Sequence, residues 1–446
     1  MTKPSVQDGL DKAGSAVNLL WKPNSAAWCP EVVLPEYAGW KVEQHAWYDS
    51  VTIADLSFHM SDTFISGPDA TKALTATSAN NYQNFAIGQA KQFVPVAEDG
   101  NIITDGILLR TGEQQYTLSG PPPAQNWVMY HSERLGLDVE FTVNRETSAR
   151  RDGSDPALFR YQIQGPLAVQ LIEDVLGAPF PDIKFFHSAM VTIAGRPVRA
   201  LRHGMAGQAG AEFIGDWKDA AVVKEALLKA GQQYKLVHQG ARSYPTASMG
   251  SGWIPSPTPA IYTDPALEQY RRWLSLFSYE GQKPLLGSYY SPNIEDYYCS
   301  PYELDYGRSI SFNHEFIGRD ALLKARDNAP RAKVTLVFDR DEVTRVLGQD
   351  PGFVHHYWRN RVETADGTLA GVTFQTDWLD PVGTVMALTL LDKQQAVPGT
   401  QVEVVWGQHP GAGTDPEADL GFPRMRATVH PAPYNVESRT AYRDKA

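Results

Sequence analysis

Cysteine is scarce in this chain of 446 residues, which contains only Cys29 and Cys299. Neither stands in a Cys-x-x-Cys pair or a cysteine–histidine cluster, so the sequence gives no sign of a structural zinc site. Two isolated cysteines are typical of a reducing compartment. The N-terminal segment is polar and lacks the apolar core of a secretion signal. We therefore expect a cytoplasmic protein.

Long apolar runs and positive charge are also scarce. No stretch approaches the roughly 18 consecutive apolar residues that a membrane span requires. The formal net charge is −11, and the basic residues form only short groups such as Arg150-Arg151 and Arg271-Arg272. A nucleic-acid-binding surface needs an extended basic stripe opposite the phosphates. The composition thus predicts neither a membrane nor a nucleic acid as a partner.

Several common cofactor and catalytic motifs are missing. The chain has no dinucleotide-binding G-x-G-x-x-G, no P-loop and no G-x-S-x-G nucleophile elbow. The glycine-rich segment 204–210 has the wrong spacing for a dinucleotide turn and favours a tight turn between strands. The pair His355-His356 and the single His59 do not make a metal motif. We expect no bound metal.

Aromatic residues, by contrast, are plentiful, with 11 Trp and 20 Tyr. Such rings suit a pocket for flat ligands, although core packing accounts for most of them. Tyr, Trp and Pro together are dense in segment 242–262, where four prolines restrict the backbone and would fix Tyr244 and Trp253 in place. From the residues alone, this segment is equally consistent with a structural wrap over a domain surface.

The length predicts two or three domains. Residues 1–35 look irregular because of their prolines, and a helix is expected within 36–51. A pattern of strands, a turn and a helix then occurs twice between residues 50 and 240, which predicts two related α+β units. In this region we expect strands over 51–58, 93–120 and 190–204, a strand, turn and helix over 158–177, and helices over 66–77 and 219–236.

The C-terminal part has a different character. A further helix is expected from Gly318 onward, and segment 327–332 is a plausible linker. Beyond it, strand patterns dominate. This favours a separate β-rich or barrel-like domain, with strands over 333–339, 371–378, 382–392, 400–407 and 424–430.

Four segments, in this order, resemble the glycine-cleavage T-protein (aminomethyltransferase) family. They are ADLSFHMSDTFISGPDA (54–70), GNIITDGIL (100–108), QIQGP (162–166) and FIGRDAL (316–322). The resemblance implies an α+β fold with three domains in a cloverleaf. A folate-binding region over 1–330 would contain two α+β subdomains, roughly 36–155 and 156–330, and residues 331–446 would form a β-barrel-like domain.

Within that family the chain is most similar to the tetrahydrofolate-dependent O-demethylases of vanillate, 3-O-methylgallate and syringate. The similarity is carried by NWVMYH (126–131), RYQIQGP (160–166), LRHGMAG (201–207), SGWIPSPTPAIYT (251–263) and SPNIEDYYCSPYE (291–303). It implies that a methyl group passes from an aryl methyl ether to N5 of tetrahydrofolate, giving a phenol and 5-methyltetrahydrofolate.

The resemblance also assigns roles to particular residues. The catalytic tyrosine of the family's Arg-x-Tyr-Pro motif falls on Tyr244, and a histidine that would orient or relay a proton falls on His59. The folate-stacking tryptophan falls on Trp253, and the acidic residue at the pterin edge on Glu212. Two further residues, Arg242 and Asp105, are expected to support cofactor binding.

The sequence departs from the demethylases in the region expected to bind substrate. Pro121, after Ser119 and Gly120, stands where relatives carry an arginine for the substrate carboxylate, and an assisting tyrosine is replaced near Trp28. Phe58 replaces a polar neighbour, and Gly250 replaces a glutamate. An Arg–carboxylate pair is strong and specific. We therefore expect Trp28, Ser119 and Phe58 to line a pocket for a small aromatic ether that differs from the relatives' substrates.

Two other functions stay open at this stage. One is another folate-dependent methyl or aminomethyl transferase, acting on a sulfonium or amine donor. The other is a non-enzymatic folate-binding protein, although the Lys-Gly-Cys-Tyr-x-Gly-Gln motif of such relatives is absent. The sequence makes no prediction of the oligomeric state.

Overall fold

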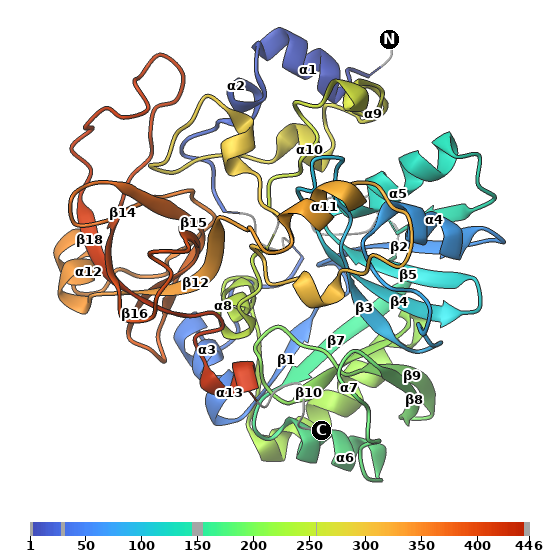
Figure 1. Cartoon of the computed structure of the whole chain (residues 1–446). Helices are drawn as coiled ribbons and strands as arrows, with labels where there is room; N and C mark the ends of the chain where they lie inside the picture. Colours follow the sequence, from blue (N-terminus) through green and yellow to red (C-terminus); the bar gives the residue numbers. More distant parts are fainter. Residues whose placement is uncertain (1–2, 28–31, 145–154, 256, 441–446) are drawn as a thin grey trace.

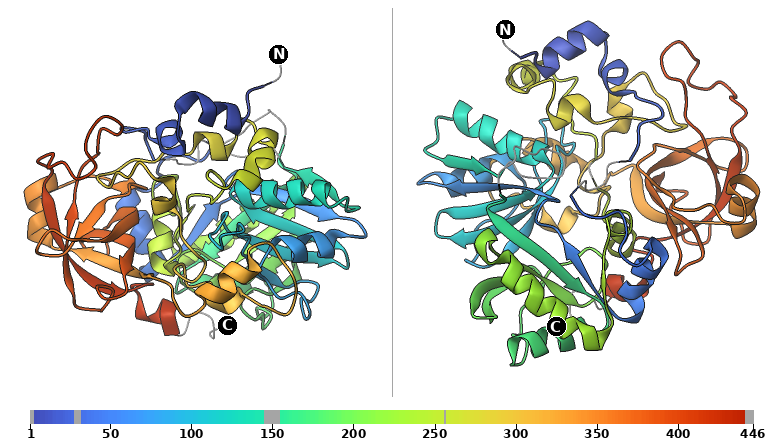
Figure 2. Two further views of the ribbon diagram at one scale, coloured as in Figure 1. Left: turned by 45° about the horizontal axis from the view of Figure 1, so that its top comes forward. Right: turned by 180° about the vertical axis from the view of Figure 1, so that it is seen from behind.

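The structure, a computed structural model, describes residues 3–27, 32–144, 155–255 and 257–440. Three lobes surround a central segment, as Figure 1 shows. Two of the lobes contain mixed or antiparallel sheets covered by helices, and the third is a closed β-barrel. In the further views of Figure 2, the barrel and the five-stranded sheet lie on opposite sides of the central segment. No helix in the described ranges is long and apolar enough to cross a membrane.

The expectation that residues 1–35 are irregular is wrong. They contain α1 (Val6–Ala13) and α2 (Ala16–Leu20). Helix α1 begins with a capping box, in which the Ser5 side chain accepts from the Asp8 amide and the Asp8 side chain accepts from the Ser5 amide. This Ser-x-x-Asp pattern was a readable helix-start signal that the nearby prolines obscured.

A five-stranded antiparallel sheet forms the first lobe. Its order is β3 (Ala90–Phe93), β4 (Gly106–Gly112), β5 (Gln115–Gly120), β2 (Ser61–Ser66) and β6 (Glu140–Val143). Helices α4 (Ala70–Thr77) and α5 (Pro122–Arg134) bury Leu74 and Val128 against it. The sequence predicted the meander and α4.

A six-stranded mixed sheet forms the second lobe. Its order is β11 (Leu236–His238), β1 (Val51–Asp55), β7 (Leu158–Gln164), β10 (Gly210–Asp216), β9 (Arg196–Leu201) and β8 (Ser188–Ile193). Helices α6 (Ala168–Leu176) and α7 (Ala220–Gly231) share its buried core. Strand β1 precedes the first lobe in the chain but pairs with β7 and β11 of the second. The two sheets are therefore interleaved in sequence and are not divided by one boundary near residue 155.

The turn between β9 and β10 requires glycine at two positions. A Cβ at Gly204 would lie 1.7 Å from the Gln164 amide nitrogen, and Gly207 has a φ of +66°. Only glycine fits such a close approach, and Gly207 adopts a left-handed conformation that other residues rarely take. The glycine-rich segment is thus a turn between strands, as predicted.

Residues 331–431 form the third lobe, a six-stranded closed barrel. Around the barrel the strands are β15 (Leu369–Leu379), β14 (Arg361–Glu363), β17 (Gln401–Val405), β18 (Arg424–Pro431), β12 (Arg331–Phe338) and β16 (Thr384–Asp392), and β16 pairs back to β15. Strand β13 (His355–His356) adds to β15, and α12 (Arg340–Leu347) packs alongside. Closure pairs the strands all the way round. The expected barrel-like domain is confirmed.

Short helices make up the central segment. The 3-10 helix η3 (Tyr244–Ala247) runs into α8 (Ser248–Ser251), which lies near the centre of Figure 1. Helix α3 (Trp40–Asp49), predicted within 36–51, and the barrel strand β15 both donate hydrogen bonds to this segment. It is therefore fixed from more than one lobe.

Candidate active site

Strand β7 presents two chemically different faces. Phe159, Tyr161 and Ile163 point into the core beneath α6 and α7. The alternating positions carry Arg160 and Gln162, which are buried on the opposite face. Because side chains alternate along a strand, a polar row inside a buried strand must meet other polar groups.

Arg160 lies between two carboxylates. Its guanidinium donates to Glu212 Oε2 at 3.0 Å and to Asp62 Oδ1 at 3.1 Å. A third bond, of 2.9 Å, goes to Ser119 Oγ, which itself donates to Asp62. Burial disfavours the charge of Arg160, but the two carboxylates outweigh this and raise its pKa above the ordinary value. The guanidinium is permanently charged and its partners fix its position.

Glu212 lies on β10 opposite Gln162 and is only 3% exposed. Its Oε1 accepts from the Gln162 amide at 3.1 Å, and His203 Nε2 lies 3.8 Å from the same oxygen. Burial lowers the pKa of His203, against the opposing effect of Glu212. A carboxylate has about four acceptor sites. Glu212 therefore retains capacity for further donors.

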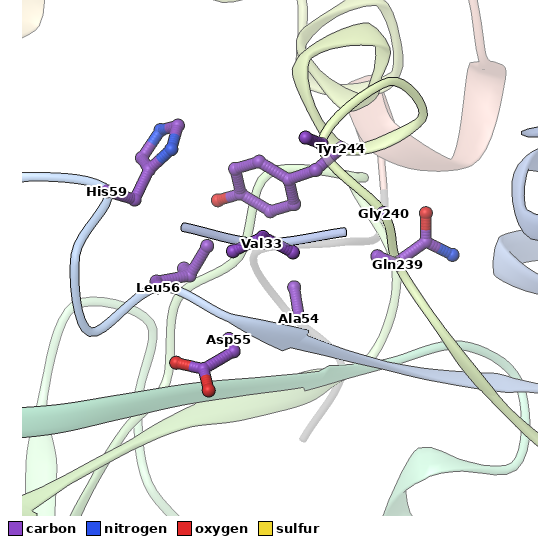
Figure 3. A pocket seen from close by; sticks show the side chains of 9 residues that line it. Val33, Ala54, Asp55, Leu56, His59, Gln239, Gly240 and Tyr244 are labelled. Carbon is purple, nitrogen blue, oxygen red and sulfur yellow. The ribbon is translucent and has the colours of Figure 1, made fainter. Parts of the chain in front are cut away.

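His59 and Tyr244 face each other beside this cluster. Their rings meet edge to face, with centroids 5.0 Å apart. They line a cavity of about 10 Å³ between the turn after β1 and segment 239–244, and Figure 3 shows the Tyr244 hydroxyl directed toward the His59 side. This volume is about that of one water molecule, so in this conformation the cavity is too small for an aromatic ligand.

Burial dominates the acid–base properties of both side chains. It lowers the pKa of His59 to about 4, so the imidazole is neutral near pH 7. Burial, reinforced by the negative charge of Glu212, raises the pKa of Tyr244 well above its usual value. Within the described part of the chain, no hydrogen bond of ordinary geometry engages the buried Tyr244 hydroxyl, although Gln162 lies close enough to oppose the rise in its pKa. The hydroxyl is therefore a protonated donor available to a ligand.

A second polar cluster centres on Asp105. Its Oδ2 accepts from Trp253 Nε1 at 2.6 Å, from the Tyr306 hydroxyl at 2.8 Å and from the Gln92 amide. Its Oδ1 is buried and has no partner among the described residues. Burial raises the pKa of Asp105, although the three donors oppose this effect. The cluster thus orients the indole of Trp253 and leaves one acceptor oxygen unused.

The two clusters adjoin. Strand β4 begins directly after Asp105, and its Ile107 pairs with Ser119 on β5. The ring of Trp253 packs against the apolar group that contains Leu56, Met205 and Tyr244. The predicted residues Tyr244, His59, Glu212, Ser119, Asp105 and Trp253 therefore gather in one region.

Arg242 and Phe58 contact residues outside the two clusters. Arg242 is exposed and pairs with Glu36 at 2.5 Å, so its contacts lend no support to a cofactor-binding role. The Phe58 ring packs edge-on against Trp217, with centroids 5.5 Å apart. Trp28 lies outside the described residues. Ser119 is fully engaged by Arg160 and Asp62, which makes it part of the site's framework.

The structure also accounts for one departure from the demethylases. A Cβ at Gly250 would lie 2.5 Å from the carbonyl oxygen of Ala206, so no side chain fits there. Pro121, the other departure, is the N-cap residue of α5 and supplies no side-chain capping bond.

Sequence reasoning missed the role of several site residues, above all Arg160, Asp62, Gln162, Gln92 and Tyr306. Arg160 and Gln162 did leave a signal, because LFRYQIQ alternates apolar and polar residues inside a strand flanked by buried elements. Tyr306 left none, since its contact with Asp105 spans 201 residues. In the described ranges, no group of three or more His, Cys, Asp or Glu residues is placed to hold a metal ion.

The chain belongs to the GCVT family, whose N-terminal domain matches residues 26–255. Along its whole length it is similar to the syringate O-demethylase of Sphingobium sp. (strain NBRC 103272 / SYK-6), with 35% identity over 99% of this chain and 98% of the relative. It is 29% identical to the sesamin methylene transferase of Sinomonas sp. (strain No.22), over 90% of this chain and 89% of the relative. The crystal structure of the glycine cleavage system aminomethyltransferase T from Bartonella henselae shares its fold, with a TM-score of 0.62 at 17% identity and 96% of both chains covered.

Proposed function

We propose that this protein demethylates an aryl methyl ether by transferring the methyl group to N5 of tetrahydrofolate. The observation that carries the proposal is that a buried, protonated Tyr244 hydroxyl and the Asp105–Trp253 cluster lie in one region of the fold. The chain is also similar over its full length to a syringate O-demethylase. Its two isolated cysteines suit a reducing, cytoplasmic setting.

The residues present fit a reduced folate. Asp105 Oδ1 is a buried acceptor without a donor among the described residues, and a pterin carries several N–H groups. Glu212 retains acceptor capacity beside its bonds to Arg160 and Gln162, so it can receive paired donors at the pterin edge. The indole of Trp253 offers a flat wall for a ring. When bound, tetrahydrofolate supplies the nitrogen that accepts the methyl group.

Tyr244 is placed to deal with the leaving group. A phenolate leaves poorly unless the departing oxygen is protonated or stabilised. Because burial and Glu212 keep the Tyr244 phenol protonated, it can donate a hydrogen bond to the ether oxygen as the carbon–oxygen bond breaks. The proton that N5 loses on methylation balances the one that the leaving phenolate takes up, so Tyr244 ends the reaction protonated. Such general-acid assistance contributes about 10²- to 10⁴-fold to a rate.

His59 and Arg160 complete the site. The neutral imidazole of His59 packs against the edge of Tyr244 and orients it or relays its proton. Arg160 is neutralised by Asp62 and Glu212, so it does not substitute for the carboxylate-binding arginine that Pro121 replaces. We infer a methoxylated aromatic substrate that does not rely on an Arg–carboxylate pair at this position.

Product analysis tests the proposal. Purified protein is incubated with tetrahydrofolate and vanillate, syringate, guaiacol, a chlorinated methoxybenzoate or sesamin, and folates and phenols are quantified by liquid chromatography with mass detection. We expect 5-methyltetrahydrofolate and the matching phenol in equimolar amounts from at least one methyl ether. Tyr244→Phe should lower the rate by about 10²- to 10⁴-fold. Tyr302→Phe, which removes a hydroxyl bound to Leu322 O away from the site, should not.

Two outcomes would redirect the assignment. If folate binds but no ether yields methylfolate, amine and sulfonium donors come next, as does methylene transfer if only sesamin reacts. If tetrahydrofolate does not bind, the chain is not a folate enzyme.

A further inference from the structure

The turn that carries Tyr244 makes hydrogen bonds to two other parts of the fold. On its N-terminal side, Glu43 of α3 accepts from the Gly240 amide at 2.9 Å and from Ser243 Oγ at 2.6 Å. The Gln44 amide, also on α3, donates to Thr246 Oγ1 at 3.1 Å. These contacts fix where the turn begins.

The C-terminal side of the turn is held by the barrel. Gln375 on β15 is fully buried, and its Nε2 donates to the carbonyl oxygen of Pro245, the residue after Tyr244, at 3.0 Å. Ser248 Oγ lies 2.8 Å from Gln375 Oε1 and 2.9 Å from Pro245 O, so its proton is shared between them. One amide thus spans the residue following Tyr244 and the start of α8.

The orientation of that amide is itself determined. Gln375 Nε2 also donates to Asp377 Oδ2 at 2.6 Å, and Asp377 Oδ1 lies 2.6 Å from His355 Nδ1. A flipped amide would place its oxygen against two acceptors, Pro245 O and Asp377 Oδ2, which makes the flip costly in a buried site. Asp377 and His355 are 0% and 3% exposed. The barrel therefore holds Gln375 in one orientation.

We propose that Gln375 is a positioning residue, through which the C-terminal barrel sets the place of the Tyr244 hydroxyl. Its amide does not line the cavity between His59 and Tyr244, and it acts through the Pro245 carbonyl. General-acid catalysis depends on the distance between the phenol and the departing oxygen, and a displacement of about 1 Å can cost about 100-fold in rate. The inference rests on the proposed function for its kinetic consequence only.

Gln375→Met keeps a similar volume and removes all three hydrogen bonds. We expect kcat to fall by about 10- to 100-fold, with KM for the ether and Kd for tetrahydrofolate within about twofold of the parent. The fall should be smaller for a chlorinated methoxybenzoate than for guaiacol, because a better leaving group depends less on proton donation. A loss that is equal for all leaving groups would overturn the inference.

Thr373→Val is the matched control. Thr373 lies two residues earlier on β15, is equally buried, and loses bonds to Trp358 O and the Asn360 amide without contacting the Tyr244 turn. It should lower thermal stability but leave the dependence of kcat on the leaving group unchanged. If both variants behave alike, Gln375 contributes only to barrel stability.

A readout that does not depend on turnover separates this inference from the proposed function. 3-Fluorotyrosine is incorporated at position 244, and its ¹⁹F resonance is compared among the parent, Gln375→Met and Thr373→Val. We expect a shifted or broadened resonance in Gln375→Met alone. An unchanged resonance would refute the positioning role even in a protein that demethylates ethers. Conversely, a shifted resonance in a protein inactive on every ether would leave the positioning role standing and overturn the proposed function.

Discussion

The site contains two clusters of buried carboxylates, and the negative charge is compensated in a different way in each. Around Glu212, a permanently charged arginine balances the carboxylates and both Glu212 oxygens are engaged. Around Asp105, three neutral donors converge on one oxygen while the other has none in the described structure. In the first cluster each Glu212 oxygen already has a donor and keeps room for another, whereas in the second cluster Asp105 Oδ1 has none among the described residues. This difference favours a framework role for Glu212 beside its proposed part in cofactor binding, whereas Asp105 Oδ1 is free to accept a donor from a ligand.

The largest effect should come from removing the charge that completes the first cluster. Arg160→Met leaves two carboxylates buried without a cation, so we expect a loss of about 3–5 kcal/mol in the free energy of unfolding, measured by urea denaturation. Arg242→Met removes the exposed pair with Glu36 and should cost about 0–1 kcal/mol. Equal losses in the two variants would mean that the buried cluster does not stabilise the fold.

Substitutions of Asp105 and Glu212 should differ in their effects on tetrahydrofolate affinity and on stability. Asp105→Asn places an amide N–H where the unused oxygen stood, so the Kd of tetrahydrofolate should rise about 10- to 100-fold with no loss of stability. Glu212→Gln leaves Arg160 with a single carboxylate and should lower stability and affinity together. Fluorescence titration and thermal unfolding of both variants measure the contrast. If Asp105→Asn is destabilised but binds tetrahydrofolate as the parent does, Asp105 belongs to the framework of the site and does not bind the cofactor.

A pH series sharpens the comparison further. Burial raises the pKa of Asp105 above its unfolded value of 3.8, so the folded protein binds this proton more tightly than the unfolded chain does. The stability due to Asp105 is therefore complete below pH 3.8 and declines as pH rises from there to the folded pKa. Without folate, Asp105→Asn should gain stability relative to the parent over that rise. If the difference in stability between the parent and Asp105→Asn does not change with pH, the pKa of Asp105 is not raised by folding.

The smallest effect concerns the indole edge. Trp253→Phe keeps an aromatic wall but removes the donor to Asp105 Oδ2, so the Kd of tetrahydrofolate should rise by about fivefold, as expected for one neutral hydrogen bond. Isothermal titration would resolve it. A rise as large as that of Asp105→Asn would mean that Trp253 acts mainly by orienting the carboxylate.

Much of this organisation could be predicted from the sequence, and the exceptions have physical causes. The expected strands and helices between residues 36 and 330 and the C-terminal barrel were confirmed because their periodic patterns are local. Helix α1 was missed because its cap was outweighed by nearby prolines. The family resemblance pointed to five residues whose side chains the fold brings into one region: Tyr244, His59, Glu212, Asp105 and Trp253.

The partners of these residues were harder to find. Arg160 meets Asp62 across 98 residues and Tyr306 meets Asp105 across 201, and no local pattern encodes such contacts. The direction of a side chain is equally hidden from sequence reasoning: Arg242, the first residue of the motif that contains Tyr244, is exposed to solvent. Position in a motif does not determine where a side chain points.

The interleaving of β1 with the second sheet has a consequence for how the chain is made. Ile53 pairs with Ile163, about 110 residues later, and with His238, about 185 residues later. At a synthesis rate of about 5–20 residues per second, this strand waits on the order of ten seconds for its first neighbour. Meanwhile the first lobe, from β2 to β6, can assemble around its own helices. An N-terminal fragment ending near residue 155 would leave β1 without either neighbour, as an apolar edge exposed to other chains.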